Sequence, residues 1–161
     1  MDKEKLLQFL LKARTKTYAG GGGKVKPVFK DSDQLEYEED DWSYRDVYYT
    51  GNGIFTGLEA VYYQDKAVWS MSYYGNFKKM KEEELDSILR QALLDNWEKA
   101  RTWQKVEWEK GDYKYICEPD KAEDLEREEF TGSIEEMAGT EKIFKRDKDV
   151  YTFVYAGGLI G

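Results

Sequence analysis

The sequence contains no histidine and a single cysteine, Cys117. Without histidine, Ser-His and Cys-His catalytic pairs and histidine-ligated metal sites are excluded. One cysteine can form neither an intrachain disulfide nor a thiolate zinc site. We therefore expect no metal, no cofactor and no nucleophilic catalysis. We expect Cys117 to be a buried, inert thiol in a strand rather than a reactive one.

Long apolar runs are also lacking. The N-terminal segment MDKEKLLQFLLKAR holds too short an apolar stretch for a signal peptide or a membrane span. The 25 basic and 33 acidic residues give a net charge of −8, which repels the phosphate backbone of nucleic acids. We expect a cytoplasmic protein, monomer or homodimer, without direct nucleic-acid or membrane binding. Its expected partner is an unknown small molecule or protein.

Aromatic residues, in contrast, are abundant. They make up 16% of the 161 residues, with five Trp and thirteen Tyr. Disordered chains are poor in such residues, so we expect a folded protein. The length suits one compact domain over residues 1–161.

The chain contains the same unit twice. LEYEEDDWSY at 35–44 resembles VEWEKGDYKY at 106–115, and GLEAVYYQDKAVWSMSYYG at 57–75 resembles GTEKIFKRDKDVYTFVYAG at 139–157. KART occurs at both 12–15 and 99–102. Self-similarity of this kind predicts two pseudo-repeats, 1–80 and 81–161. Because the second half is longer, we expect an insertion within 118–138, an acidic segment that could hold a short helix.

Each repeat is predicted to be one helix followed by four antiparallel strands. Apolar periodicity predicts helices at 3–16, capped by Asp2, and at 82–101, burying Leu85, Ile88, Leu89, Ala92 and Trp97. Runs rich in Tyr, Trp and Val predict strands at 35–39, 42–49, 57–63, 67–74, 106–109, 112–117, 141–145 and 150–155. Turns are predicted at Asn52-Gly53, Asp65-Lys66 and Asp147-Lys148.

The predicted fold class is therefore α+β: a tandem αββββ duplication with antiparallel sheets of about eight strands in total. Its helices are expected to pack on one face. The other face is expected to be open and rich in Trp and Tyr.

The glycine run Gly20–Gly23 suggests a phosphate-binding loop but lacks its other features. Val25 stands where such a loop has Ser or Thr after the lysine, and a helix rather than a strand precedes it. A structural role is favoured, and a weak anion nest with Lys24 stays open. With 33 acidic residues, neighbouring carboxylates are more typical of a solvated face than of a glycosidase.

Aromatic residues alternate with polar ones along the predicted strands, which either marks a binding surface or decorates solvated strands. Arg45, Asp46 and Glu59 could supply polar contacts among these rings. Gly20–Gly23 follow Tyr18-Ala19, and a second glycine cluster, Gly157-Gly158, follows Tyr155-Ala156. We expect the two clusters to flank one ligand-binding cleft. The candidate ligand-binding residues are Tyr18, Gly21, Gly22, Lys24, Trp69, Tyr73, Tyr155 and Gly157.

Three stretches, FLLKARTKTYAGGGGKV at 9–25, VWSMSYYG at 68–75 and VYAGGLI at 154–160, resemble a bacterial domain family of unknown function with a TYAGGGGKV motif. Its members occur alone or behind an XRE-type helix-turn-helix in transcriptional regulators. The resemblance implies a sensor or interaction role and no catalytic residues. This chain departs from the regulators in having no helix-turn-helix of its own.

We expect a non-enzymatic binding or sensor domain that uses an aromatic-rich sheet face or inter-repeat cleft. One alternative is an enzyme that acts on a small substrate through carboxylates and tyrosines. The other is a structural dimerisation module. A binder is expected to have no strongly shifted carboxyl pKa in the cleft, whereas an acid–base enzyme needs one.

Overall fold

The computed structural model describes residues 2–123, 125–126 and 130–161. Within these residues, a helix and four strands are followed by a second helix and four more strands. The elements are α1 Lys3–Lys16, β1 Asp33–Glu39, β2 Trp42–Gly51, β3 Ile54–Tyr63, β4 Lys66–Asn76, α2 Glu82–Asp95, β5 Val106–Lys110, β6 Tyr113–Pro119, β7 Glu136–Lys145 and β8 Lys148–Leu159.

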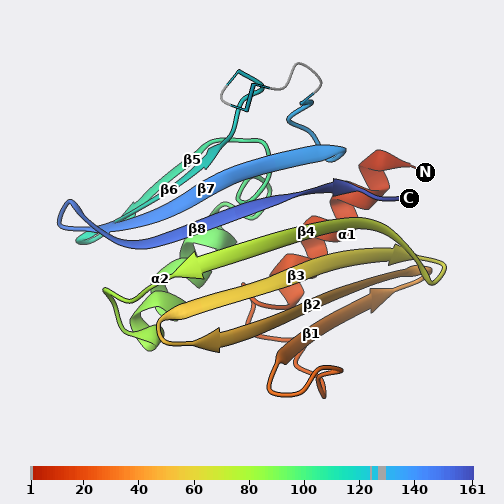
Figure 1. Cartoon of the computed structure of the whole chain (residues 1–161), viewed down its shortest axis with the longest axis horizontal. Coiled ribbons are helices and arrows are strands. Elements are labelled where there is room, and N and C mark those ends of the chain that lie inside the picture. Colours follow the sequence, from red (N-terminus) through yellow and green to blue (C-terminus); the bar gives the residue numbers. More distant parts are fainter. Residues whose placement is uncertain (1, 124, 127–129) are drawn as a thin grey trace.

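The eight strands form one antiparallel sheet in the order β1-β2-β3-β4-β8-β7-β6-β5 (Figure 1). Each set of four consecutive strands is a meander. The pairing of β4 with β8 joins the two meanders at the centre of the sheet. The predicted α+β class and the number of strands are confirmed.

Tight hairpin turns connect the strands within each meander, except between β6 and β7. Asn52 and Gly53 both have positive φ, as do the pairs Gln64-Asp65 and Arg146-Asp147, which is the signature of a type I′ turn. The turn at Asn52-Gly53 is therefore confirmed. The other two turns begin one residue earlier than predicted, because Lys66 and Lys148 already belong to strands.

Helix α1 matches its predicted range. The Asp2 carboxylate caps it by accepting hydrogen bonds from the backbone N–H groups of Glu4 and Lys5. The buried face includes Leu6, Leu10 and Phe9. The Phe9 ring stacks on Trp42 of β2 at 5.6 Å between centroids.

Helix α2 is shorter than predicted. It ends at Asp95, and the Asn96 side chain donates a hydrogen bond to the Ala92 carbonyl of the last turn. The chain then folds back through irregular turns to Arg101, which has a φ of 59°. Leu85, Ile88, Leu89 and Ala92 are buried as predicted. The prediction for Trp97 is wrong: it lies beyond the helix and is 45% exposed.

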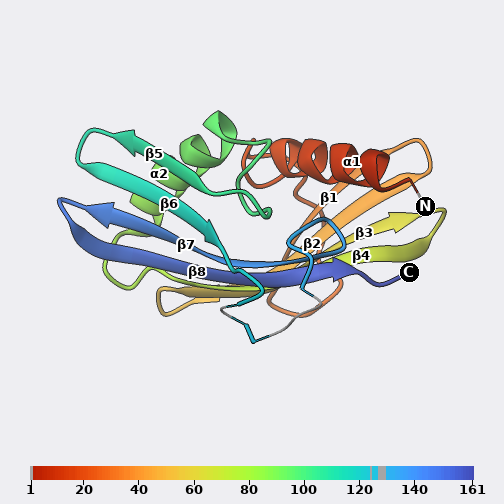
Figure 2. The ribbon, with the colours of Figure 1, turned by 90° about the horizontal axis from the view of Figure 1, so that it is seen from above.

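Figure 2 shows α1 and α2 on the same side of the sheet, and both belong to its hydrophobic core. The expectation of an open face rich in Trp is wrong, because the strand tryptophans contact helices. Trp42 packs on Phe9, Trp69 lies against Arg14, and Trp108 donates a hydrogen bond to Asp95. Two helices of 14 residues are each about 21 Å long, too short to cover eight strands. Large side chains of the core fill much of the space between the helices and the sheet.

The predicted insertion is the connection between β6 and β7. It runs from Asp120 to Glu135, whereas the equivalent β2–β3 connection is the Asn52-Gly53 turn. The described part of this connection contains turns and no helix; residues 124 and 127–129 of the expected short helix lie outside the described residues. Neither helix of the described chain is long and apolar enough to cross a membrane.

Candidate functional site

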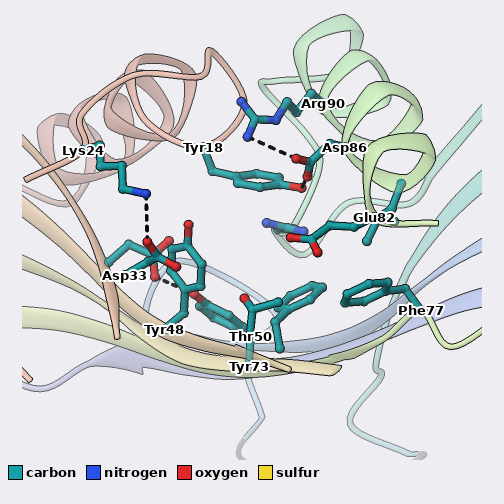
Figure 3. Close-up of a pocket in the computed structure, with 14 residues that line it drawn as sticks. Tyr18, Lys24, Asp33, Tyr48, Thr50, Tyr73, Phe77, Glu82, Asp86 and Arg90 are labelled. Carbon is teal, nitrogen blue, oxygen red and sulfur yellow. Dashed lines mark hydrogen bonds and ion pairs between the residues drawn. The ribbon is translucent and has the colours of Figure 1, made fainter. Parts of the chain in front are cut away.

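A cavity of about 220 Å³ lies between the helices and the inner face of the sheet. Figure 3 shows its lining side chains between the two helices above and the strands below. Aromatic and ionisable side chains form most of its wall. The lining residues are Tyr18, Lys24, Asp33, Asp46, Tyr48, Thr50, Phe55, Tyr73, Phe77, Glu82, Leu85, Asp86, Arg90 and Arg101.

Strand β2 supplies the polar centre of the sheet side. Alternate residues of a strand share one face, so Asp46, Tyr48 and Thr50 all line the cavity. Asp46 is only 6% exposed. Its Oδ1 accepts a 2.5 Å hydrogen bond from the Tyr73 hydroxyl. No described residue donates to Oδ2, which leaves one oxygen of a buried carboxyl available to a ligand.

Gly57 makes the Tyr73–Asp46 hydrogen bond possible. Tyr73 lies opposite Gly57 in the β3–β4 register, and a Cβ at Gly57 would lie 2.5 Å from the Tyr73 hydroxyl oxygen. The absent side chain therefore opens the path along which Tyr73 reaches β2. Gly139 and Tyr155 repeat this pair in the second meander.

Asp46 also faces a second carboxylate. It lies directly opposite Glu59 in the β2–β3 register, and like charges in such a pair repel. Glu59 has its own partner, since Arg14 of α1 donates from Nε at 3.0 Å and from Nη2 at 2.7 Å. Burial and the charge of Glu59 raise the pKa of Asp46 to about 7, against the opposing effects of Tyr73, Arg101 and Arg14.

The second meander repeats this arrangement with one change. Arg101 pairs with Glu141 as Arg14 pairs with Glu59. The residue opposite Glu141 is Cys117, which contacts the Tyr155 hydroxyl at 3.5 Å. A neutral, buried thiol thus occupies the place of the Asp46 carboxyl. Burial raises the pKa of Cys117, which agrees with the inert thiol predicted from the sequence.

Arg101 forms part of the wall. Its Nε and Nη2 donate to the two oxygens of Glu141 at 3.0 and 2.9 Å, and its guanidinium lies 4.2 Å from the centroid of the Phe153 ring. No described residue accepts a hydrogen bond from Nη1. A non-glycine residue with positive φ is strained, and here the strained backbone directs a buried arginine to the cavity.

Tyr18, Asp86 and Arg90 line the helix side (Figure 3). The Tyr18 hydroxyl donates to Asp86 at 2.9 Å, and the Arg90 guanidinium lies 4.7 Å from the Tyr18 ring centroid. Gly21 has a φ of 74°, and a Cβ there would lie 2.9 Å from Arg90 Nη1. The glycine run thus brings the backbone next to Arg90, although Gly21 does not itself line the cavity.

The cavity rim is charged. Lys24 forms an ion pair with Asp33 at 3.0 Å. Glu82, the first residue of α2, extends toward the space beneath Tyr18 in Figure 3. Tyr48 points its hydroxyl from the sheet into the same space. Burial and the nearby Asp33 and Asp46 raise the pKa of Tyr48 to about 12, so this hydroxyl remains protonated.

The structure brings together only part of the site expected from the sequence. Tyr18, Lys24 and Tyr73 line the cavity, and their role in ligand binding stays a prediction. The other candidates lie outside it. Trp69 is fully buried beside Arg14; Tyr155 donates a hydrogen bond to the Thr102 carbonyl; Gly22 packs on the Lys16 carbonyl, and Gly157 on Ser70 and Met71 of β4.

The two glycine clusters consequently do not flank one cleft. Gly20–Gly23 follow α1, whereas Gly157 and Gly158 lie inside β8, between β4 and β7. That expectation is wrong because the second cluster is part of the sheet itself, where small residues allow close packing of neighbouring backbones.

Sequence reasoning missed Arg101 and gave Asp46 only a general polar role. One signal was present: Glu59 and Glu141 match between the halves, as do the arginines of the two KART segments. When both halves carry a glutamate and an arginine at matching positions, and the surrounding residues are aromatic and face inward, the match indicates buried ion pairs. The two halves differ at the position held by Asp46 in the first and by Cys117 in the second, and Asp46 lines the cavity.

No group of His, Cys, Asp and Glu side chains placed to hold a metal ion occurs in the described part of the chain. Comparison with curated proteins and with solved structures found no match. A family model, "Domain of unknown function (DUF5680)", matches residues 46–160. This match begins at Asp46 and spans β2 to the end of the sheet, and so covers most of the cavity wall. The chain therefore belongs to the DUF5680 family of domains of unknown function.

Proposed function

We propose that the protein is a non-enzymatic binding or sensor domain that holds a small molecule in the cavity between its helices and its sheet. The supporting observation is that Asp46 and Arg101 are buried in the wall with one polar atom each left unpaired among the described residues. Ligand pockets typically combine apolar and aromatic walls with a few such polar groups. Arg90, which also lines the cavity, has a buried Nε without a hydrogen-bond partner among the described residues, whereas buried polar atoms are almost always hydrogen-bonded.

A thermal-shift screen against small metabolites tests this proposal, because a ligand that binds the native state raises the melting temperature. The matched variants are Thr50→Trp and Tyr49→Trp. Thr50 lines the cavity rim, whereas the adjacent Tyr49 side chain lies on the opposite face of β2. We expect Thr50→Trp to abolish ligand-induced shifts and Tyr49→Trp to retain them. Equal shifts in both variants would place binding elsewhere.

Asp46 also favours a second candidate, an enzyme that uses this carboxyl as a general acid or base. Its pKa of about 7 is what such catalysis requires, and it differs from the unshifted carboxyl expected of a simple binder. Binding remains the first proposal because burial raises the pKa of the Tyr44 and Tyr73 hydroxyls. Tyr44 and Tyr73 therefore remain protonated, and neither can readily accept a proton during an acid–base reaction.

NMR spectra of a metabolite mixture incubated with the protein distinguish the two candidates. An enzyme would convert a compound in amounts exceeding the protein present, and Asp46→Asn would stop the conversion. A binder would only broaden or shift the resonances of one compound without consuming it.

We also infer that the chain arose by tandem duplication of an αββββ unit, with both helices on one face of the joined sheet. Support comes from the repeated element order, from the repeated Arg–Glu pairs and from the equivalent turns that precede Lys66 and Lys148. Expression of residues 1–80 alone tests the idea. A homodimer of this fragment with the β4 edges paired is expected, and an unfolded fragment would count against independent units.

A further inference from the structure

Every basic residue that lines the cavity already has a carboxylate partner. Lys24 pairs with Asp33, Arg90 with Asp86, and Arg101 with Glu141. Behind the wall, Arg14 is paired with Glu59. The charge of each of these cations is therefore already balanced by a resident carboxylate, although the Nη1 group of Arg101 and the buried Nε group of Arg90 have no acceptor among the described residues.

Two lining carboxylates have no basic partner among the described residues. Asp46 lies deep in the cavity and Glu82 lies at its rim. The deep one is nine-tenths buried and has an oxygen without a donor, so the site is not a solvated acidic patch. The matching position of the other half is the neutral Cys117, so the second meander has no carboxylate opposite Glu141.

We propose that the ligand is a small organic cation whose ammonium or guanidinium group binds Asp46, with Glu82 adding negative charge at the rim, an inference that rests on the binding function proposed above. Charge-assisted hydrogen bonds to a carboxylate are strong when both groups are shielded from water. A bound cation would balance the buried charges, since Asp46 is the carboxyl left over once Arg14 and Arg101 are paired.

The size and walls of the cavity restrict the rest of the ligand. A volume of about 220 Å³ is below the usual range of about 300–1,000 Å³ for drug-sized ligands. Phe55, Phe77 and Tyr48 provide ring surfaces for an apolar body. An inorganic cation fits poorly, because Ca²⁺ prefers about six to eight oxygen ligands and the cavity offers two free carboxylates. The expected class is a small amine or guanidine with an apolar or aromatic body.

Matched probes that differ only in charge test the proposal. The probes are 2-phenylethylamine, its neutral N-acetyl derivative and the anionic 3-phenylpropionate, together with agmatine as an aliphatic guanidine and KCl as a bare cation. Binding is measured by ligand-observed NMR on the whole chain. We expect the amine or the guanidine to bind, and the neutral, anionic and inorganic probes to bind at least about tenfold more weakly.

Variants of the two carboxylates test which of them contributes to binding of the amine. Asp46→Asn keeps the shape of the side chain and is expected to weaken amine binding by about tenfold or more. Glu82→Gln, at the exposed rim, is expected to weaken it by about two- to fivefold. Glu83→Gln removes the adjacent acid of α2, which does not line the cavity, and is expected to change nothing. Because Glu82 is exposed, its variant remains informative even if Asp46→Asn alters the core.

The outcomes separate this inference from the proposed function. Preferential binding of a cationic probe that depends on Asp46 supports both. Binding of the neutral or anionic probe in the cavity, blocked by Thr50→Trp, overturns the cation class and retains the binding function. An affinity for amines that Asp46→Asn and Glu82→Gln leave unchanged overturns the assigned contact. Absence of binding by all organic probes counts against both.

Discussion

Replacing Asp46 by asparagine is expected to stabilise the free protein at alkaline pH. The pKa of this carboxyl rises from 3.8 to about 7 on folding, chiefly through burial and the charge of Glu59. The native protein therefore retains a proton that the unfolded chain releases. This contribution is fully present below about pH 4 and is lost as pH rises through 7. A rise of this size corresponds to a cost of about 4 kcal/mol at pH 8.

Asparagine removes the buried charge but retains an oxygen that can accept the Tyr73 hydrogen bond. That bond to a neutral oxygen is weaker than the bond to a carboxylate by about 1 kcal/mol or more. We therefore expect a net gain of about 1–3 kcal/mol in the free energy of unfolding at pH 8 and almost none at pH 5. Such a gain in stability at the expense of function is typical of binding sites.

Urea denaturation measures the gain, provided that the dependence on urea is the same in both proteins. The control is Glu38→Gln, an exposed acid of β1, because removing any acid from a chain of net charge −8 reduces self-repulsion. The reasoning is refuted if Asp46→Asn is no more stable than this control at pH 8. It is also refuted if the difference between the two proteins is the same at pH 5 and pH 8.

Three further predictions follow from the same contacts. Cys117→Asp places a second unpaired carboxyl opposite Glu141 and is expected to cost about 3 kcal/mol or more in urea melts at pH 8, whereas Cys117→Ser is expected to cost less. Leu89→Ala removes a fully buried side chain of α2 and is expected to cost about 2–5 kcal/mol; a loss below about 0.5 kcal/mol would show that this helix face is outside the core. The affinity for 2-phenylethylamine is expected to increase as pH rises through about 7, because the cation binds ionised Asp46; a pH-independent affinity between pH 5 and 8 would contradict that contact.

We assign the expected pH dependence of stability and of amine affinity to Asp46 on the basis of the ionisable groups that surround it. These are Tyr44 and Tyr48 on its own strand, Glu59 on β3, Tyr73 on β4, Arg14 on α1 and Arg101 beyond α2. Burial raises the pKa of the three tyrosines, and both arginines are held by carboxylates. Asp46 is the group in this set with a pKa raised to about 7.

Much of the fold was predictable because its signals are local. The cap at Asp2 and the apolar spacing after it predict α1 to the residue, and the Asn52-Gly53 pair predicts its hairpin. The end of α2 was not predictable in this way. Apolar spacing continues to Ala100, but the chain leaves the helix at Asn96, and Arg101 beyond it forms a buried ion pair with Glu141. Contacts 40 residues apart in sequence thus override local preference.

The site was less predictable than the fold because it depends on which faces meet. Alternation places Tyr73 and Asp46 on inward faces, but only the register shows that Gly57 allows them to touch. Tyr155 has the same alternation as Tyr73 but donates a hydrogen bond to the Thr102 carbonyl outside the cavity, a difference that the sequence does not show. The sequence alone shows that Asp46 and Cys117 occupy the same position in the two repeats. Only the structure shows that the Asp46 carboxyl has an oxygen, Oδ2, without a hydrogen-bond donor among the described residues.

The pKa of Asp46 in the free protein and with 2-phenylethylamine tests the central claim most directly. It can be read from the side-chain carboxyl carbon in ¹³C NMR spectra, assigned with Asp46→Asn. We expect a pKa of about 7 in the free protein and a clear decrease when the amine binds, because a cation favours the ionised form. A pKa near 4 in the free protein, or a value that the bound amine does not lower, would contradict the claim that Asp46 is a buried carboxyl that has no basic partner among the described residues and binds a cationic ligand.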